Sequence, residues 1–278
     1  SKYNNIITID SNNEYNTLEF VVKKNNSKNK NYDVTIDPGH GGMDGGGASG
    51  NYKETDFTMD ISKKVKSNLE KAGITVKLTH DEGDIDKNHV MDEYNKGGRA
   101  VIPNEVKSKY TFSIHINKSG SSKVKGIEVY TPSDINYDLA KDIVNNITSN
   151  TSLGYSSNRL YKKFDGIYTH NFTESEVKSA IDGYDEKNYK HYNVTTKSNY
   201  LYMIRETGGF ITGAYVDNSN PDKVGVNPYY DSNIGNESYL LELGYISNST
   251  DVNTLKEEQD ALAKAISDSI IKEINEKM

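Results

Sequence analysis

Cysteine and tryptophan are both absent from the 278 residues of this chain. Without cysteine there can be no disulfide, no cysteine-ligated zinc cluster and no thiol nucleophile. Hydrophobic residues are also scarce, at 34% of the sequence. Tyrosine compensates in part, because the 21 tyrosines can bury their rings while each hydroxyl keeps a hydrogen bond. A packed core is therefore expected, and any metal site must use ligands other than cysteine.

Dense runs of positive charge and long apolar runs are missing as well. The formal net charge is −7, which argues against nucleic acid as a partner and against simple electrostatic attraction to an anionic membrane or wall polymer. No stretch reaches the roughly 20 apolar residues that cross a bilayer, and no signal peptide is visible. The numbering begins at Ser1 rather than at a methionine. A membrane anchor is therefore expected only if an N-terminal segment has been removed.

The clearest secondary-structure pattern lies in residues 32–78. Residues 32–36 alternate apolar and polar side chains, which predicts a strand that ends at Pro38. Apolar residues then recur every four positions through 57–69, which predicts a helix, and residues 74–78 alternate again. A strand–helix–strand unit of this kind predicts two parallel strands in one sheet.

The rest of the chain continues this alternation of strands and helices. Further strands are predicted at 110–116, 126–130 and 239–245, and further helices at 99–109, 137–150, 174–181 and 251–278. Residues 1–32 are expected to form a small hairpin or N-terminal extension, and residues 207–236 a long loop. We therefore expect an α/β fold: a mainly parallel twisted sheet flanked by helices on both faces, with a long insertion before the last strand.

Two polar side chains lie between the first strand and the first helix. His40 comes just past the strand, where ligands gather in open α/β sheets, and the neighbouring glycines allow a tight turn that exposes the imidazole. Asp37 is close enough in sequence to orient this loop or ring as a hydrogen-bond acceptor. Glu54 stands at the start of the helix, where a carboxylate is also favoured simply by the helix N-terminus. A structural and a functional explanation are equally open for Glu54.

His115 and Glu242 belong to two other predicted strands. His115 shares the polar face of its strand with Ser113, and a hydrogen-bonded structural histidine is its ordinary explanation. Glu242 is surrounded by leucines on an apparently central strand, where a carboxylate must be paired, bound to metal or functional. Two histidines with one carboxylate leave a coordination position for water, as in catalytic zinc sites, and a nearby glutamate can serve as acid and base.

The four remaining histidines have weaker contexts. His80 and His89 lie in or near an acidic segment, and His170 and His191 lie in the tyrosine-rich middle of the chain. We expect all four to be solvated.

Three segments resemble the motifs of one known family. Residues 34–54 read VTIDPGHGGMDGGGASGNYKE and resemble the opening motif of the zinc-dependent N-acetylmuramoyl-L-alanine amidases, the amidase-3 family. The ASGN stretch is most similar to the spore-cortex type. Residues 113–117, followed by 126–130, resemble the second motif, and residues 241–248 resemble the last. The motifs occur in family order, so the catalytic domain is expected to span 33–278.

This resemblance implies a role for individual residues. The family's zinc ligands correspond to His40, Glu54 and His115, and its catalytic glutamate corresponds to Glu242. Arg205 resembles a family arginine near the site. The family fold, a mainly parallel sheet between helices, agrees with the fold expected from the sequence pattern.

The chain also departs from the family pattern. His80 stands where arginine is usual after the second strand, and Thr55 stands where lysine is common after the glutamate ligand. The glycine run 45–47 is slightly longer than usual. The largest departure is the segment 207–236, where the family has only a few residues. These changes leave the metal ligands in place and affect substrate binding and regulation.

The resemblance implies a Zn²⁺ hydrolase that cleaves the amide bond between N-acetylmuramic acid and L-alanine in peptidoglycan. Two alternatives remain open: a zinc peptidase acting on stem peptides, and a partner-regulated wall-binding protein with reduced activity. The expected partners are peptidoglycan and a regulatory protein, not nucleic acid. The expected location is outside the cytoplasm, in the cell wall or spore envelope of a bacterium.

Overall fold

A seven-stranded sheet forms the centre of the computed structural model, which describes residues 31–42, 44–81, 98–133, 135–182, 190–192, 194–207, 215–217 and 236–277. The strands lie in the order β4 (Val76–Leu78), β1 (Val34–Pro38), β5 (Tyr110–Asn117), β11 (Glu237–Tyr245), β6 (Ile127–Tyr130), β8 (Ile167–Tyr168) and β7 (Lys162–Phe164). The pairs β4/β1, β1/β5, β5/β11 and β6/β8 are parallel, and the pairs β11/β6 and β8/β7 are antiparallel. The predicted mainly parallel sheet is confirmed.

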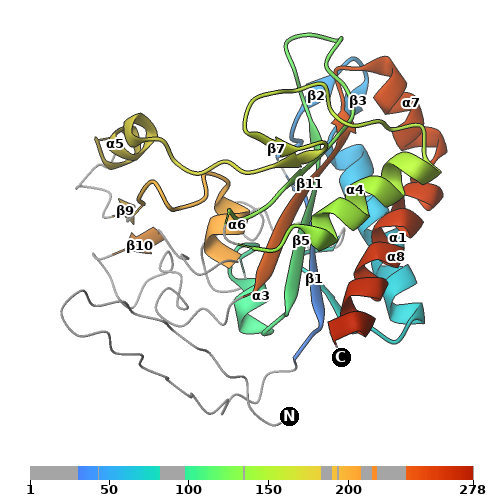
Figure 1. Ribbon diagram of the computed structural model, residues 1–278, viewed down its shortest axis with the longest axis horizontal. Coiled ribbons are helices and arrows are strands. Elements are labelled where there is room, and N and C mark those ends of the chain that lie inside the picture. The colour runs from blue at the N-terminus through green and yellow to red at the C-terminus, as the bar shows by residue number, and fades with distance from the viewer. Residues whose placement is uncertain are drawn as a thin grey trace.

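Helices flank both faces of this sheet, as predicted. Three long helices cover one face: α1 (Thr55–Lys71), α4 (Asp138–Asn150) and α8 (Gln259–Lys277) (Figure 1). Both α1 and α4 pack against α8. The short helices α3 (Ile102–Glu105) and α6 (Tyr202–Thr207) lie on the other side (Figure 1). Within the described residues, no helix combines the length and the apolar character needed to cross a membrane.

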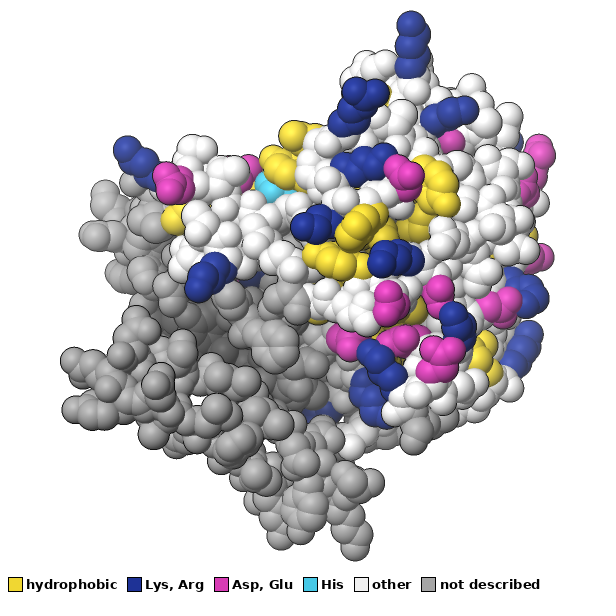
Figure 2. Space-filling view, in the orientation of Figure 1, with side chains coloured by type: hydrophobic (Ala, Val, Ile, Leu, Met, Phe, Trp, Pro, Cys, Tyr) yellow, Lys and Arg dark blue, Asp and Glu magenta, His cyan; other side chains and the backbone are white. Residues whose placement is uncertain are grey.

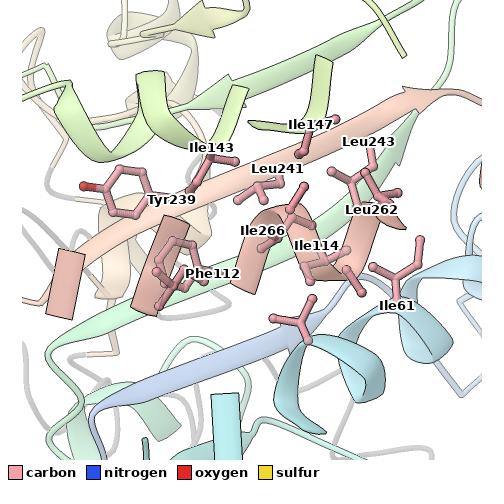
Figure 3. Close-up of a cluster of buried hydrophobic side chains, with 14 of the residues drawn as sticks. Ile61, Phe112, Ile114, Ile143, Ile147, Tyr239, Leu241, Leu243, Leu262 and Ile266 are labelled. Atoms are coloured by element: carbon pink, nitrogen blue, oxygen red, sulfur yellow. The ribbon is translucent and has the colours of Figure 1, made fainter. Parts of the chain in front are cut away.

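The hydrophobic core lies between the sheet and the three long helices. Figure 3 shows side chains of β5, β11 and the helices pointing toward one another, among them Phe112, Ile114, Tyr239, Leu241, Ile61, Ile143 and Ile266. The rings of Phe112 and Tyr239 are stacked, with centroids 5.3 Å apart. Each fully buried side chain of this kind contributes about 1.5–3 kcal/mol. Because strand side chains alternate, the apolar residues occupy one face and leave the opposite face to polar residues.

The opposite face of the sheet is polar and yet buried. Six of its side chains are at most 1% exposed: Thr35, Asp37, Thr111, Ser113, Glu128 and Ser238. Asp37 is the register partner of Ser113 in the β1/β5 pair, and His115 is the register partner of Glu242 in the β5/β11 pair. Three of the side chains singled out from the sequence, Asp37, His115 and Glu242, therefore come from this face.

Asp37 anchors the polar face below the His40 loop. Its carboxylate accepts two hydrogen bonds from the Arg99 guanidinium, both 2.7 Å long, and one each from Thr79 Oγ1 (2.7 Å) and Ser113 Oγ (2.6 Å). Burial alone would raise the pKa of Asp37, but the Arg99 charge and the hydrogen bonds hold that pKa well below its usual range. Asp37 is thus a buried anion with a full set of donors.

Replacing Asp37 by asparagine should lower the free energy of unfolding of the metal-free protein by about 3–5 kcal/mol, because the buried Arg99 guanidinium would lose the charge of the carboxylate that accepts two of its hydrogen bonds. Asp142→Asn is the control, since Asp142 pairs with Lys272 on the surface, and it should cost less than about 1 kcal/mol. Denaturant unfolding at pH 7 measures the free energy of unfolding of both variants. Equal effects of the two substitutions would contradict this account.

The same carboxylate makes stability depend on pH. Because the folded-state pKa of Asp37 is depressed, its contribution to the free energy of unfolding is present above the unfolded-state pKa and is lost as the pH falls toward the folded-state pKa.

The C-terminal segment is two helices, not the single helix predicted over 251–278. A single residue, Glu258, separates helix α7 (Ser249–Glu257) from α8, and its backbone is non-helical. The Asn248 side chain accepts hydrogen bonds from two backbone N–H groups of the first turn of α7, which is a standard N-cap. No proline or glycine marks the break, so the pattern of apolar residues alone could not reveal it.

The helix predicted over 99–109 is shorter in the structure, where α3 has only four residues and includes Pro103. The smaller elements are β2 (Ala48–Ser49), β3 (Tyr52–Lys53), α5 (Glu174–Asp182), β9 (Lys190–Tyr192) and β10 (Tyr215–Asp217). Strand β10 lies within the predicted insertion 207–236 and pairs with β9. Residues 208–214 and 218–235 of that insertion, and residues 1–30 of the predicted hairpin or extension, lie outside the described residues. The domain boundaries stay a prediction.

Two histidines that were expected to be solvated are buried, so this expectation was wrong for them. His80 and His170 are each 7% exposed. His80 Nε2 donates to the carbonyl oxygen of Pro38 (2.8 Å), and the His170 ring is stacked between two tyrosine rings. Both burials depend on partners distant in sequence. His89 lies outside the described residues, and the side chain of His191 is not described.

Candidate metal centre

The loop that carries His40 follows directly from β1. The Gly39 N–H donates to the carbonyl oxygen of Ile114 (2.7 Å), which ties the loop to β5. His40 has a φ of 61°, a left-handed conformation that is uncommon for a residue other than glycine and is found where the surroundings impose it, often at functional sites. Its Nδ1 lies 2.7 Å from Asp44 Oδ2. This carboxylate partner fixes the ring so that Nε2 faces Glu54.

Glu54 connects the two histidines. It directly precedes α1 and is 4% exposed. Its Oε2 lies 3.1 Å from His40 Nε2 and accepts from the Gly47 N–H (2.9 Å), while its Oε1 lies 2.9 Å from His115 Nδ1 and accepts from the Ile116 N–H (2.8 Å). Burial alone would raise the pKa of Glu54, but the hydrogen bonds with His115 and His40 hold that pKa well below its usual value. Glu54 is therefore an anion between two imidazoles.

His115 comes from the middle of the sheet. It lies on β5, is 9% exposed, and its ring meets the His40 ring edge to face with centroids 4.9 Å apart. Its Nε2 atom is buried and has no hydrogen-bond partner among the described residues. An unpartnered imidazole nitrogen at such a place is costly unless something else binds there.

The three predicted ligands converge. One nitrogen or oxygen atom from each of His40, Glu54 and His115 lies within 4.8 Å of the others. Burial alone lowers the pKa of His40, but the Glu54 and Asp44 carboxylates raise it to about 9, so the cluster favours an additional positive charge. A divalent cation competes with protons for such a place. Two imidazoles and one carboxylate are the donor set of catalytic zinc sites, and these residues fit a metal ion.

Glu242 lies beside this cluster on the neighbouring strand, where it is the register partner of His115. It lines a cavity of about 370 Å³, and its Oε2 atom is buried with no hydrogen-bond partner among the described residues. The pKa of Glu242 is raised well above its usual value, first by burial and then by the nearby Glu54 and Glu128 carboxylates. A glutamate of this kind can exchange a proton at neutral pH.

Glu128 is a further buried carboxylate to which the sequence assigned no role. It is the register partner of Glu242 on β6 and is fully buried. Tyr130 OH (2.9 Å), Asn117 Nδ2 (3.1 Å), Ser156 Oγ (2.7 Å) and the Tyr245 hydroxyl donate to it. The signal that could have found it is the one that identified Glu242, a carboxylate inside an apolar strand. Asp44 was missed too, although a carboxylate four residues after His40 is a natural partner for the ring.

Arg205 is buried on α6 and holds the adjoining loop. Its Nη1 donates to the carbonyl oxygens of Asn199 (3.0 Å) and Tyr200 (2.7 Å), and its Nε lies 3.2 Å from Glu206 Oε1. The guanidinium also lies over the Phe172 ring, 5.5 Å from the centroid. Arg205 therefore positions Tyr200, and its predicted catalytic role stays a prediction.

A glycine is required at position 46, beside the candidate metal ligands. It has a φ of 67°, and a Cβ atom there would lie 2.5 Å from His40 Cδ2 and 2.7 Å from Glu54 Oε2. Gly46→Ala should therefore displace the side chains of two candidate ligands and lower metal affinity by about tenfold or more. A loss of this size also follows mutation of a residue that hydrogen-bonds to a metal ligand. Gly50→Ala is a matched control, because Gly50 has a φ of 57° and nothing within 4 Å of its Cβ position. Competition with a chelating dye measures the metal affinity of both variants, and equal affinities would contradict the prediction.

Known proteins resemble this chain in sequence. It is 30% identical over 147 residues to the germination-specific N-acetylmuramoyl-L-alanine amidase of Bacillus subtilis, covering 49% of this chain and 59% of that protein. It is 33% identical over 117 residues to the probable cell wall amidase LytH of Staphylococcus saprophyticus, covering 41% of this chain and 36% of that protein. The matched region thus spans less than two thirds of either relative.

Solved structures share the fold. The CwlD amidase from Clostridioides difficile, determined in complex with the GerS lipoprotein, has a TM-score of 0.56 at 20% identity and covers 88% of this chain and 99% of that chain. The catalytic domain of CwlV, an N-acetylmuramoyl-L-alanine amidase from Bacillus (Paenibacillus) polymyxa var. colistinus, has a TM-score of 0.54 at 23% identity and covers 87% of this chain and 97% of that chain.

The family comparison extends over most of the chain. Residues 34–272 match the family described as N-acetylmuramoyl-L-alanine amidase. This range includes every strand of the central sheet and the cluster of His40, Glu54 and His115. The motifs, the fold and this match agree: the chain belongs to the amidase-3 family of N-acetylmuramoyl-L-alanine amidases.

Proposed function

We propose that this chain is a zinc-dependent hydrolase that cleaves the amide bond between N-acetylmuramic acid and L-alanine in bacterial peptidoglycan. The observation that carries the proposal is the convergence of His40, Glu54 and His115 beside Glu242, in a chain of the amidase-3 family. Relatives named for this activity or as cell wall amidases support the substrate.

His40, Glu54 and His115 would hold the zinc ion. When bound, zinc supplies a Lewis acid that lowers the pKa of water and stabilises negative charge on the carbonyl oxygen of the substrate. The Asp44 carboxylate at His40 Nδ1 keeps Nε2 free for the metal. Below the loop, Asp37 is fixed by Arg99 and Ser113, which holds the His40 loop against the sheet.

Glu242 would move the proton. Its carboxylate lies on the same sheet face as His115 and lines the adjoining cavity, so a substrate there can reach it. We propose that Glu242 takes a proton from the attacking water and gives it to the nitrogen of L-alanine as the amide bond breaks. The products are a glycan strand with a free lactyl carboxylate and a stem peptide with a free amino terminus.

Digestion of purified peptidoglycan tests this proposal and separates it from its alternatives. The proposed amidase releases stem peptides whose new amino terminus is L-alanine and leaves the sugar chain intact. A zinc peptidase would instead expose amino groups within the stem peptide. Labelling new amines and identifying the fragments by mass spectrometry distinguishes these outcomes. Absence of any new amine with zinc-loaded protein would count against both hydrolases and favour a wall-binding protein.

We propose that the chain acts outside the cytoplasm, where peptidoglycan lies, and that a regulatory protein partner is part of its function. The CwlD amidase, which has a similar fold, was solved together with the GerS lipoprotein. Zinc content of the isolated chain tests whether a partner is needed to load the metal. About one zinc per chain would show that none is needed for loading, and zinc uptake only after addition of a partner would show the reverse.

A further inference from the structure

The cavity beside Glu242 has an aromatic wall. The rings of Tyr161, His170 and Tyr200 are stacked nearly parallel, with successive centroids 3.5 and 4.2 Å apart. All three residues line the same cavity of about 370 Å³ as Glu242. Leu160 extends this wall toward solvent and is 62% exposed. Figure 2 shows a histidine beside hydrophobic side chains on the face in view. An apolar wall next to a reactive carboxylate is typical of a substrate site.

Tyr161 is held in an unusual conformation within this wall. Its φ is 61°, which is a genuine outlier for a bulky residue and costs free energy that the surroundings must supply. The backbone carbonyl of Tyr161 accepts from the Thr169 N–H (3.0 Å), and the ring packs against His170. Arg205 in turn holds the backbone of Tyr200. The stack is therefore built by the fold and is not an accidental surface contact.

The polar side of the cavity presents hydrogen-bond acceptors. Tyr130 and Tyr245 both line it, and the hydroxyls of both donate their protons to Glu128. Because each hydroxyl proton is already used, the hydroxyl oxygen can act toward a ligand only as a hydrogen-bond acceptor. A ligand rich in hydroxyl and amide N–H groups fits these acceptors.

The charge of the cavity favours a neutral ligand. Among the described residues that line it, Lys118 and Glu242 carry the formal charges. Burial lowers the pKa of His170, although Glu176 acts in the opposite direction, and this favours the neutral imidazole. A stem peptide carries several carboxylates, for which Lys118 is the one cationic side chain among the described lining residues, whereas an N-acetylated sugar whose lactyl group is in amide linkage carries none. The apolar C–H groups of a sugar ring can also pack against the edges of the stacked rings.

We propose that this cavity, walled by Tyr161, His170 and Tyr200, is a subsite for an N-acetylated sugar ring of the glycan strand, adjoining the amide that is cleaved at Glu242. The proposal rests on the proposed function, because that function supplies the substrate. The sugar ring lies against the aromatic wall, its hydroxyl and acetamido N–H groups donate to the tyrosine oxygens, and the lactyl group extends toward the metal ligands. The enzyme would therefore select glycan strands by their sugars and not by their peptides alone.

The test uses a peptide-free disaccharide of N-acetylglucosamine and N-acetylmuramic acid as the probe, with its lactyl carboxylate converted to the methylamide so that the probe is neutral, and binding is measured by NMR titration. Tyr161→Gly removes one ring of the wall at a backbone conformation that glycine adopts without strain, and Tyr200→Ala removes another. Each should weaken binding of the disaccharide by about five- to tenfold. Tyr155→Ala is the matched control, because Tyr155 is a similarly exposed tyrosine (45%, against 44% for Tyr200) that does not line the cavity; it should bind like wild type.

Kinetics provide a second readout. With peptidoglycan fragments as substrate, Tyr161→Gly should raise KM with little change in kcat, and with a lactyl-peptide that lacks the sugar it should behave like wild type. Equal disaccharide binding by all variants would overturn the subsite, as would a selective loss of affinity for the free stem peptide. Failure of wild type to cleave any muramoyl amide would refute the proposed function instead, while the disaccharide titration would still decide the sugar subsite.

Discussion

Glu242→Gln should retain zinc and lose amide hydrolysis by about 10²–10⁴-fold. Glutamine has nearly the shape of glutamate, so the cavity beside β5 and β6 should be preserved. The glutamine side chain, however, cannot accept a proton from water or deliver one to the leaving nitrogen. The raised pKa of Glu242, caused by burial and by the Glu54 and Glu128 carboxylates, is what suits the native residue to both transfers.

Glu237→Gln is the matched control for this prediction. It makes the same substitution on the same strand, where Glu237 pairs with Lys277 at the surface away from the metal ligands. Its hydrolysis rate should equal that of wild type. The comparison requires zinc content and release of amino groups from peptidoglycan for each protein. A Glu242→Gln variant that turns over at the wild-type rate would remove Glu242 from the reaction.

His115→Ala should abolish stable zinc binding and, with it, hydrolysis. His115 supplies one of the three donor groups. Its removal should therefore lower zinc affinity by more than the roughly 10–100-fold that follows the loss of a hydrogen-bond partner of a ligand. Asp44→Asn provides that graded comparison, because Asp44 contacts His40 Nδ1 and is not itself among the three donors. Competition with a chelating dye at pH 7 measures both affinities. His115→Ala binding zinc as tightly as Asp44→Asn would contradict the proposed ligand set.

Most of what the sequence revealed about the fold came from the strand–helix–strand unit at 32–78 and from the residues at the ends of the predicted strands. The apolar spacing of 57–69 matched α1, and alternation in 110–116 placed His115 on the polar face of β5. Because the carboxyl ends of parallel strands meet at one edge, His40 and His115 could be expected to lie close together. The sheet follows from these local rules, whereas the choice of His40, Glu54 and His115 as ligands came from the resemblance to the amidase-3 family.

Features that depend on register across several strands could not be predicted in the same way. Glu242 contacts the site because β11 aligns it with His115 on one side and with Glu128 on the other. The burial of His170 depends on two tyrosines that are brought to it by separate loops. The break before α8 has no glycine or proline. None of these leaves a periodic signal along the chain, since each is decided by long-range packing.

Cationic and anionic side chains are mixed over the described part of the face in Figure 2. This agrees with the absence of a dense basic run in the sequence. The proposed recognition of the wall polymer rests on the cavity beside Glu242 and its aromatic wall, and not on a general electrostatic attraction.

Anomalous diffraction at the zinc absorption edge, from crystals of the zinc-loaded protein, tests the central claim most directly. The account predicts one strong peak about 2.0–2.2 Å from a nitrogen of His40, a nitrogen of His115 and a carboxylate oxygen of Glu54. A peak bound by other side chains, or none at this cluster in protein that hydrolyses peptidoglycan, would contradict it.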